Sequence, residues 1–272
     1  MTHPSDHSTL EQDGMRARKY RTLRTIFALI MREMSTSYGR SPGGYLWAVI
    51  DPVLALTLLS TLFSFVMRNP PLGDSFPLFY ATGYLPFMMF NDIANKTATS
   101  LNYSRPLLQY PAVTFVDALI ARAILQLVTH VLVAYVVFFG MFVIFDLRLR
   151  IDYPSIAIGY GLAALVGFGV GCFNCYAMMN FPVWERVWQI ITRPLLFISG
   201  LFLTYDAMPE VLQKVLWWNP LIHIVGFIRR GIYAPAYRGD YLSLAFPILF
   251  SLILAVLGLL LLWRHHQNLL EG

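Results

Sequence analysis

Long apolar runs are the feature that most constrains what this chain can fold into. The first begins at Tyr45 and Leu46, directly after the helix-breaking segment 38–44. A helix needs about 20 predominantly apolar residues to cross the hydrocarbon core of a bilayer. Runs of roughly this length cover 46–66, 76–94, 123–145, 156–179, 190–205 and 243–263. The pattern therefore predicts an all-α polytopic membrane protein with six transmembrane helices.

Composition and charge support a membrane location and set the expected orientation. Hydrophobic residues make up 57% of the 272 positions and charged residues only 13%, too few charges to cover a soluble globule. Basic residues gather ahead of the first run, at Arg16, Arg18, Lys19, Arg21, Arg24, Arg32 and Arg40. Because positive charge before the first span favours the cytoplasmic side, we expect both termini in the cytoplasm. Residues 1–20 form a polar tail without a cleavable signal peptide.

Residues 21–40 have the pattern of an amphipathic helix. Leu23, Ile26, Phe27, Ile30 and Met34 recur at helical spacing, and the other side carries Arg21, Arg24, Arg32 and Glu33. Such a helix can lie in the headgroup region of a membrane. The alternative is an ordinary amphipathic helix packed on a soluble core, for which the following apolar run leaves little room.

The second run is crowded with aromatic residues, among them Tyr80, Tyr84, Phe87 and Phe90. These rings could pack against lipid and neighbouring helices, or provide flat faces on which sugars stack. The polar segment that follows, about 95–105, could be an exposed connector or a docking helix for a cytoplasmic partner. Both alternatives stay open at this point.

The third run is longer than a bilayer requires, since its pattern reads from 113 to 145. This length places Asp117 and Arg122 near the cytoplasmic interface, where their five-residue spacing makes a mutual ion pair unfavourable. His130 lies deeper, where the cost of a titratable side chain makes it a functional candidate, and the alternative that we favour is a hydrogen-bonded structural histidine. Cys172 and Cys175 in the fourth run, beside a Gly167 to Gly171 small-residue spacing, are interpreted as packing residues.

Two short helix patterns precede the last run, within residues 208–233. They are joined by Asn219-Pro220 and carry interfacial Trp217 and Trp218. Each is too short to cross a bilayer, which predicts a re-entrant helix pair. Arg229 and Arg230 there could meet anionic substrate or headgroups, or only the membrane surface.

Several of these blocks together resemble the permeases of ABC-2 type exporters, most closely those that export capsular polysaccharide from Gram-negative bacteria. The resemblance rests on residues 27–34, Tyr38-Gly39-Arg40-Ser41, Gly44-Tyr45-Leu46-Trp47-Ala48 leading to Pro52, and Trp218-Asn219-Pro220-Leu221 with Arg229 downstream. It covers nearly the whole chain after about Met15, with 41–272 as the transmembrane domain. One departure is Gly226, where many members of the family have an acidic residue ahead of the arginine.

The resemblance implies a homodimer with two ATPase subunits that bind ATP and Mg, and a lipid-linked polysaccharide as substrate. It also implies a periplasmic polysaccharide copolymerase, an outer-membrane export protein and a location in the bacterial inner membrane. Contact with the ATPase is expected from Arg24, Arg32, Lys96, Thr97, Ser100, Leu101, Asn102 and Arg105. The substrate path between the two copies, lined by spans one, two and five, is expected to include Tyr45, Trp47, Tyr80, Tyr84, Phe87, Phe90, Phe202 and Tyr205. The re-entrant segment contributes Trp217, Trp218, Asn219, Pro220, Arg229 and Arg230.

The residues themselves predict no catalytic, metal or nucleotide site in this chain, and no nucleic-acid partner. None of the three lysines, Lys19, Lys96 and Lys214, follows the glycine that a phosphate-binding GxxxxGK[ST] loop requires. An intramembrane enzyme is the alternative from another class, but Asp51, Asp92 and His130 are scattered along the sequence without a catalytic motif. Within the exporter class, O-antigen, a teichoic-acid-like polymer, a lipid or a drug are alternative substrates.

Overall fold

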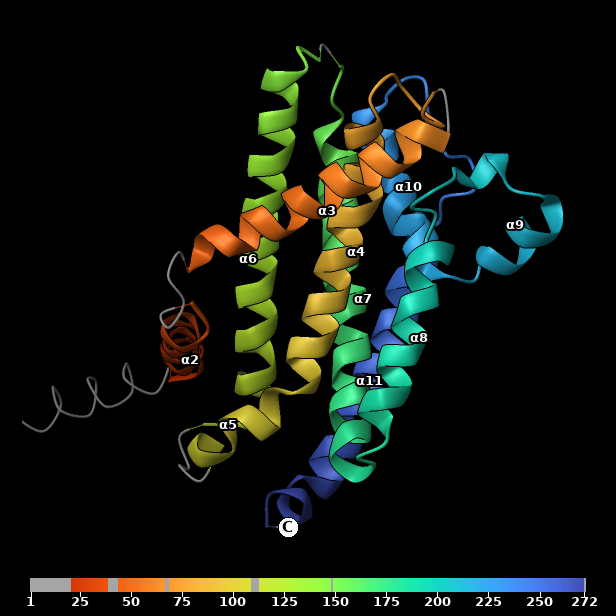
Figure 1. The fold of residues 1–272 in the computed structure, drawn as a ribbon. Helices are drawn as coiled ribbons and strands as arrows, with labels where there is room; N and C mark the ends of the chain where they lie inside the picture. Colours follow the sequence, from red (N-terminus) through yellow and green to blue (C-terminus); the bar gives the residue numbers. More distant parts are fainter. Residues whose placement is uncertain (1–20, 39–43, 67–68, 109–112, 148, 272) are drawn as a thin grey trace, which may run out of the picture.

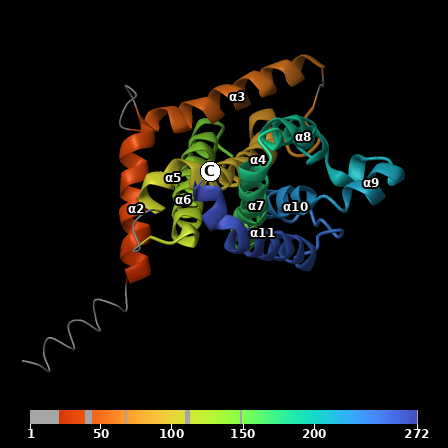
Figure 2. The same ribbon diagram turned by 90° about the horizontal axis from the view of Figure 1, so that it is seen from below.

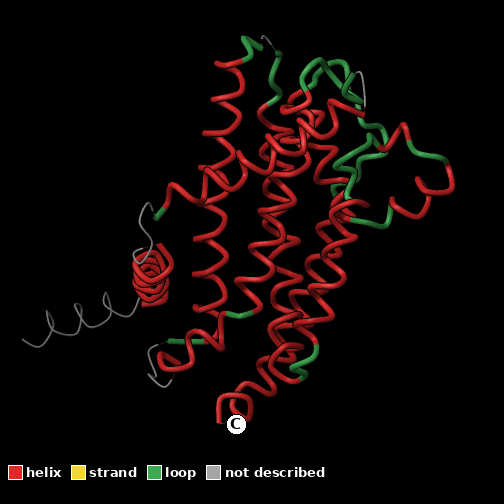
Figure 3. The backbone as a smooth tube through the Cα atoms, viewed as in Figure 1, coloured by secondary structure: helices red, strands yellow, loops and turns green. Residues whose placement is uncertain are grey.

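The part of the chain that the structure describes is built of helices joined by short loops. The structure is a computed structural model that describes residues 21–38, 44–66, 69–108, 113–147 and 149–271, without a strand among them (Figures 1 and 3). Its helices are α2 (Arg21–Tyr38), α3 (Tyr45–Val66), α4 (Phe76–Ala98), α5 (Ser100–Leu108), α6 (Phe115–Ile144), α7 (Tyr153–Asn180), α8 (Trp184–Ile198), α9 (Glu210–Leu216), α10 (Pro220–Ile232) and α11 (Ala245–Glu271), with a 3₁₀ turn at Tyr205–Ala207. The predicted all-α class is confirmed.

The long helices form a bundle around α7. Helices α4, α6, α7, α8 and α11 have roughly parallel axes, although the chain reverses its direction between α4 and α6 and again between α6 and α7, and α7 packs against α4, α10 and α11 (Figure 1). Helix α2 lies crosswise beside the bundle, and α3 runs obliquely along a second side (Figure 2). Helix α5 and the C-terminal end of α11 lie at one end, here named the α5 end, and the loop between α6 and α7 lies at the opposite end.

Four helices have the length and apolarity to cross a membrane. They are Leu46–Phe65 within α3, all of α6 and α7, and Ala245–His265 within α11. These four agree with four of the six predicted runs. The membrane class is thereby supported, and the count of six crossings stays a prediction.

The other two predicted runs correspond to helices of a different character. Helix α4 has 23 residues, which at about 1.5 Å per residue is long enough to cross. It is less apolar than the four spans because most of its side chains face the other helices rather than lipid. Helix α8 begins and ends earlier than the predicted run 190–205, at Trp184 and Ile198. Its 15 residues span only about 22 Å, and residues 199–204 are not helical.

Helix α6 is the longest helix of the bundle, with 30 residues. Thr114 and Asp117 form a capping box, in which each side chain accepts a hydrogen bond from the other residue's backbone N–H. The carboxylate of Asp117 therefore caps the N-terminus of its own helix. Arg122 lies one turn further on and is free to pair elsewhere, as its spacing from Asp117 predicted.

Small residues let α4 and α7 approach closely, as the sequence predicted. A Cβ atom added at Gly167 would lie 2.8 Å from the carbonyl oxygen of Phe90, and one added at Gly171 would lie 2.6 Å from Cβ of Thr97. Cys172 and Cys175 beside them are free thiols buried in the core. Their interpretation as packing residues is confirmed.

Candidate functional site

An ion pair at the α5 end joins α2 to the bundle. Nη2 of Arg122 on α6 lies 2.9 Å from Oε1 of Glu33 on α2, and the two side chains are only 7% and 12% exposed. The sequence pattern assigned Glu33 to the polar side of α2, and this was wrong. Glu33 follows the buried Ile26 by seven residues, two helical turns, so that it lies on the face that packs against α6.

Arg122 also holds the junction between α4 and α5. Its Nη1 donates to the backbone carbonyl of Lys96 and to Oγ1 of Thr99, both at 3.2 Å. The guanidinium carbon lies 4.3 Å from the ring centroid of Tyr103 on α5, within the range of a cation–π contact. A cation at the C-terminal end of α4 is also favoured by the helix dipole. A single side chain on α6 thus contacts α2, α4 and α5.

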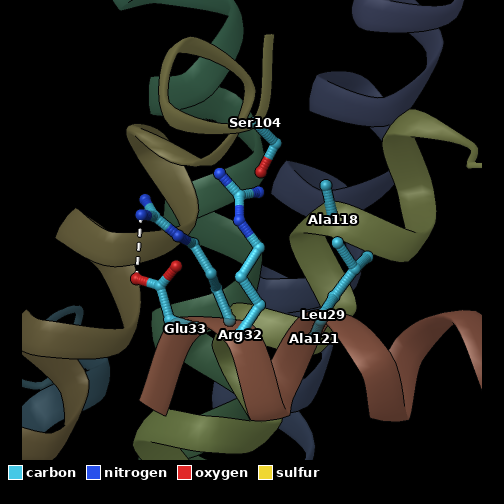
Figure 4. A pocket seen from close by; sticks show the side chains of 7 residues that line it. Leu29, Arg32, Glu33, Ser104, Ala118 and Ala121 are labelled. Carbon is cyan, nitrogen blue, oxygen red and sulfur yellow. Dashed lines mark hydrogen bonds and ion pairs between the residues drawn. The ribbon is translucent and has the colours of Figure 1, made fainter. Parts of the chain in front are cut away.

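A small crevice lies beside this ion pair, between α2, α5 and α6 (Figure 4). Its volume of about 10 Å³ leaves room for roughly one water molecule. Arg32 extends from α2 towards Ser104 of α5 across the crevice. The lining residues are Leu29, Arg32, Glu33, Ser104, Ala118, Ala121 and Arg122. The crevice is too small for an organic ligand, and it marks a joint between helices.

The residues predicted to contact an ATPase divide into a buried and an exposed group. Thr97, Ser100 and Leu101 have no exposed surface and pack inside the bundle. Arg24, Arg32, Lys96 and Asn102 are exposed, and Tyr103, which the prediction did not include, is 45% exposed. The side chain of Arg105 lies outside the described residues. The exposed group can meet a partner directly, whereas the buried group can only anchor α5.

Aromatic rings from three helices meet in the half of the bundle away from α5. The ring of Phe63 on α3 lies 5.2 Å from that of Tyr80 on α4 and 5.0 Å from that of Phe202, and Phe197 on α8 stacks on Phe202 at 5.2 Å. Phe76, also on α4, stacks on Tyr80. The structure therefore brings together Tyr80 and Phe202 of the predicted substrate path.

The remaining residues of the predicted path lie elsewhere. Phe87 and Phe90 contact each other inside the core, and Tyr205 stacks on Tyr241 at 4.0 Å. Trp47 is half-exposed on α3 and Tyr84 is partly buried on α4. Tyr45 begins α3, and its side chain lies outside the described residues. The five of these residues whose side chains are described are spread over α3, α4 and the 3₁₀ turn after α8.

The two short helix patterns before the last run are α9 and α10, which meet at an angle of 104°. Asn219 caps α10, because its Oδ1 accepts a hydrogen bond from the backbone N–H of Leu221, and Pro220 occupies the first helical position. Nδ2 of Asn219 donates to the backbone carbonyl of Ile198 at the end of α8. The Asn-Pro pair therefore starts one helix and satisfies the end of another. Trp217 donates to the carbonyl of Tyr241, and Trp218 is exposed.

Arg229 and Arg230 have different surroundings. Arg229 is 2% exposed, stacks on the ring of Phe79 at 4.3 Å and donates to the carbonyls of Leu201 and Leu203, both at 3.1 Å. It is thus the donor for backbone carbonyls left free after α8 ends, which would be costly to leave unpaired in a membrane. Arg230 is exposed and is the one of the two that can meet headgroups.

Gly226 leaves no space for the acidic residue expected ahead of Arg229. A Cβ at this position would lie 2.4 Å from Cδ2 of Leu242 and 2.5 Å from the hydroxyl of Tyr241. The local charge pair expected for the family is therefore replaced by the two carbonyls that Arg229 binds.

Two of the titratable residues that seem scattered in the sequence are in contact. Nε2 of His130 on α6 lies 2.9 Å from Oδ2 of Asp92 on α4. The expectation of a hydrogen-bonded His130 is confirmed, and its partner Asp92 was not predicted. Their separation of 38 residues gave no signal for this contact. No group of three or more metal-ligating side chains occurs in the described ranges.

The fold defines a helical membrane protein with the buried Glu33–Arg122 ion pair at one end, and the comparison with known families agrees with that class. The model of the ABC-2 type transporter family matches residues 24–233. The chain therefore belongs to the ABC-2 transporter membrane family, as the sequence resemblance implied.

Its relatives include permeases for bacterial capsules. The polysialic acid transport protein KpsM of Escherichia coli is 28% identical over 248 residues, which are 91% of this chain and 96% of KpsM. The capsule polysaccharide export inner-membrane protein BexB of Haemophilus influenzae is 30% identical, covering 88% of this chain and 89% of BexB. The corresponding protein CtrC of Neisseria meningitidis serogroup A is 26% identical, covering 90% and 92%.

Proposed function

We propose that this protein is the membrane-spanning permease of an ABC exporter that moves lipid-linked capsular polysaccharide across the bacterial inner membrane. The observation that carries this proposal is similarity along nearly the whole length of capsule export permeases from three organisms. Membership of the ABC-2 family supports a transport subunit over an intramembrane enzyme.

The proposed assembly is a homodimer of this chain with two ATPase subunits that hold ATP and Mg. Helix α5 is the coupling helix, and its exposed Asn102 and Tyr103, together with Lys96, form the contact surface. Arg24 and Arg32 of α2 add positive charge to this surface. The buried Thr97, Ser100 and Leu101 fix α5 to the bundle, so that a push on α5 is passed to the spanning helices rather than absorbed locally. A periplasmic copolymerase and an outer-membrane export protein complete the proposed route.

In this mechanism, ATP-driven closure of the ATPases moves α5 and separates α3, α4 and α8. Phe63 of α3, Tyr80 of α4 and Phe202, which lies in the segment directly after α8, form one aromatic cluster. Aromatic faces stack on sugar rings, which supports a glycan path along this cluster towards the α9–α10 pair. The bent pair is proposed to be re-entrant, because neither helix is long enough to cross.

The proposed topology has six crossings and both termini in the cytoplasm. Helices α2 and α5 and the C-terminal end of α11 lie at the same end of the bundle (Figure 1), which supports a common cytoplasmic side. Helix α2 is proposed to lie at the membrane interface. Its exposed Leu23, Phe27 and Met31 follow each other at four-residue spacing and form an apolar stripe.

Deletion of the gene from its host tests the proposal. We expect the capsule to be lost from the cell surface while lipid-linked polysaccharide accumulates inside, and expression of the intact chain to restore export. An ATPase partner with its phosphate-binding lysine replaced should give the same phenotype as the deletion. A deletion strain that keeps its capsule and becomes sensitive to small toxic compounds would contradict the proposal and indicate a drug exporter.

A further inference from the structure

Two tryptophans of helix α8 donate hydrogen bonds to the bundle, and one of them reaches α4 near the α5 end. Trp188 is the only residue of α8 that is buried. Its indole Nε1 donates to Oδ1 of Asn95 on α4 at 2.8 Å. The Asn95 amide has a fixed orientation, because its Nδ2 donates to Oδ1 of Asn91 at 3.1 Å and a flipped amide would place two donors together.

Asn95 lies in the last turn of α4, where Arg122 also binds. The hydroxyl of Thr99 donates to the backbone carbonyl of Asn95 at 3.0 Å, and the same hydroxyl accepts from Nη1 of Arg122 at 3.2 Å. Arg122 in turn pairs with Glu33 at 2.9 Å. Four successive polar contacts therefore connect α2 to α8 through Glu33, Arg122, Thr99, Asn95 and Trp188, here named the Glu33–Trp188 relay.

We propose that Asn95 and Trp188 are positioning residues that transmit movement of the α5 junction to α8. The proposal rests on the proposed function, in which α5 receives the push and α8 borders the glycan path. The last turn of α4 is held by Arg122 on one side and by Trp188 on the other. A displacement of this turn must therefore move α8 or break the bond between Asn95 and Trp188.

The alternative is that Trp188 only packs α8 onto the bundle and transmits no movement. A second tryptophan of α8 provides a matched control that distinguishes these two roles. Trp184 lies one turn earlier on the same helix, and its Nε1 donates to Oδ1 of Asn174 at 3.0 Å. Both bonds run from an indole N–H on α8 to the Oδ1 atom of an asparagine. Asn174, however, belongs to α7 and lies outside the relay. Trp184→Phe and Trp188→Phe remove the same atoms and differ in the element that is released.

The test compares export per ATP in inverted membrane vesicles that contain the chain and its ATPase, with labelled lipid-linked polysaccharide as substrate. Trp188→Phe and Asn95→Ala should lower the polysaccharide moved per ATP by roughly 2- to 30-fold, the range seen for residues on coupling networks. ATP hydrolysis should persist, and Trp184→Phe should match the wild type. Asn95→Ala leaves the Trp188 ring in place. It therefore tests the relay even if the Trp188→Phe protein does not fold and cannot be obtained in the membrane.

A double-mutant comparison separates the relay from independent packing effects. Effects of distant, independent substitutions multiply, whereas substitutions in one network do not. Glu33→Gln combined with Asn95→Ala should be no worse than the more severe single variant, whereas independent effects would multiply. Glu33→Gln combined with Trp184→Phe should export as much per ATP as Glu33→Gln alone. The relay is refuted if Trp188→Phe and Asn95→Ala keep wild-type export per ATP, or if Trp184→Phe loses as much. If wild-type vesicles move no polysaccharide at all, the proposed function itself fails.

Discussion

Glu33 and Arg122 are separated by 89 residues in the sequence, and their side chains meet at 2.9 Å in the fold. The pair connects the crosswise helix α2 to α6, and the same guanidinium binds the end of α4. Taking two charges out of water is costly unless further hydrogen bonds satisfy them. Arg122 has such bonds in the Lys96 carbonyl and the Thr99 hydroxyl, which makes it the residue on which the geometry of the α5 end depends.

Glu33→Gln should destabilise the protein although it preserves the shape of the side chain. The substitution removes the counter-charge and leaves the buried guanidinium with neutral partners. We expect the free energy of unfolding to fall by about 2 kcal/mol, the size of a hydrogen bond to a charged group. Thermal unfolding of the detergent-solubilised protein measures this loss. Arg24→Gln on the exposed side of α2 is the control, and an equal loss there would contradict the assignment.

The exposed and buried residues of the coupling segment should respond differently to substitution. Lys96→Ala combined with Asn102→Ala should weaken co-purification of the ATPase and leave the unfolding temperature unchanged, because both side chains are exposed. Leu101→Ala should instead lower the free energy of unfolding by about 2–4 kcal/mol, since the side chain is fully buried. Pull-down of the ATPase and thermal unfolding distinguish the two effects. A Lys96 and Asn102 double variant that binds the ATPase normally would remove these residues from the contact surface.

The pair between Asp92 and His130 should show a modest energetic coupling. Both residues lie in the body of the bundle, where Asp92 is about one-third exposed and His130 one-tenth. Measured side-chain hydrogen bonds between membrane helices average about 0.6 kcal/mol and reach about 1.7 kcal/mol. A cycle of Asp92→Ala, His130→Ala and the double variant, followed by thermal unfolding, should give a coupling in this range. Additive losses would show that the contact contributes nothing.

The local patterns of the sequence were sufficient for most of the fold. Apolar length predicted six crossing helices, of which four have the length and apolarity to cross in the structure, and the Asn219-Pro220 break predicted the two short helices before the last span. Helix α4 was found because its run is long, although its polar residues Asn91, Asp92 and Asn95 look unsuited to lipid. The structure explains them, since each forms a side-chain hydrogen bond within the bundle.

The long-range contacts could not be predicted, because helical spacing says which face a residue occupies and not which helix lies opposite. Glu33 was placed on the polar face since it is charged, and only the partner Arg122 explains its burial. The sequence left open whether Arg229 meets an anion or only the membrane surface, and it binds backbone carbonyls that become available only because α8 ends at Ile198. The end of α8 does carry a local signal that the prediction overlooked, because Gly200 follows the C-cap residue Ser199 with a φ of 79°, the left-handed conformation in which glycine ends helices.

Gly226 should accept a methyl group only if the side chains of Leu242 and Tyr241 move. An added Cβ would lie 2.4 Å from Leu242 and 2.5 Å from the Tyr241 hydroxyl, which stands 3.0 Å from the hydroxyl of Tyr237. Gly226→Ala should therefore cost about 1–3 kcal/mol of stability, as overpacking does. Gly161→Ala is the control, because nothing lies within 4 Å of its added Cβ and alanine favours the helix. Thermal unfolding of both variants checks this, and equal behaviour would show that the crowding at Gly226 is relieved by movement.

Arg229→Lys should destabilise the α9–α10 region although the charge is kept. The guanidinium reaches the carbonyls of Leu201 and Leu203 with two nitrogens and stacks on Phe79 with its flat face. A lysine ammonium is a compact point charge that cannot form this planar fork. At least one carbonyl would lose its donor, and we expect the free energy of unfolding to fall by about 2 kcal/mol.

Protease cleavage near Leu203 should become faster in the Arg229→Lys variant, because the segment after α8 loses its attachment to α10. Arg230→Lys, at an exposed position, should leave both the unfolding temperature and the cleavage rate unchanged. If the two lysine variants behave alike, the carbonyl contacts of Arg229 do not hold this segment.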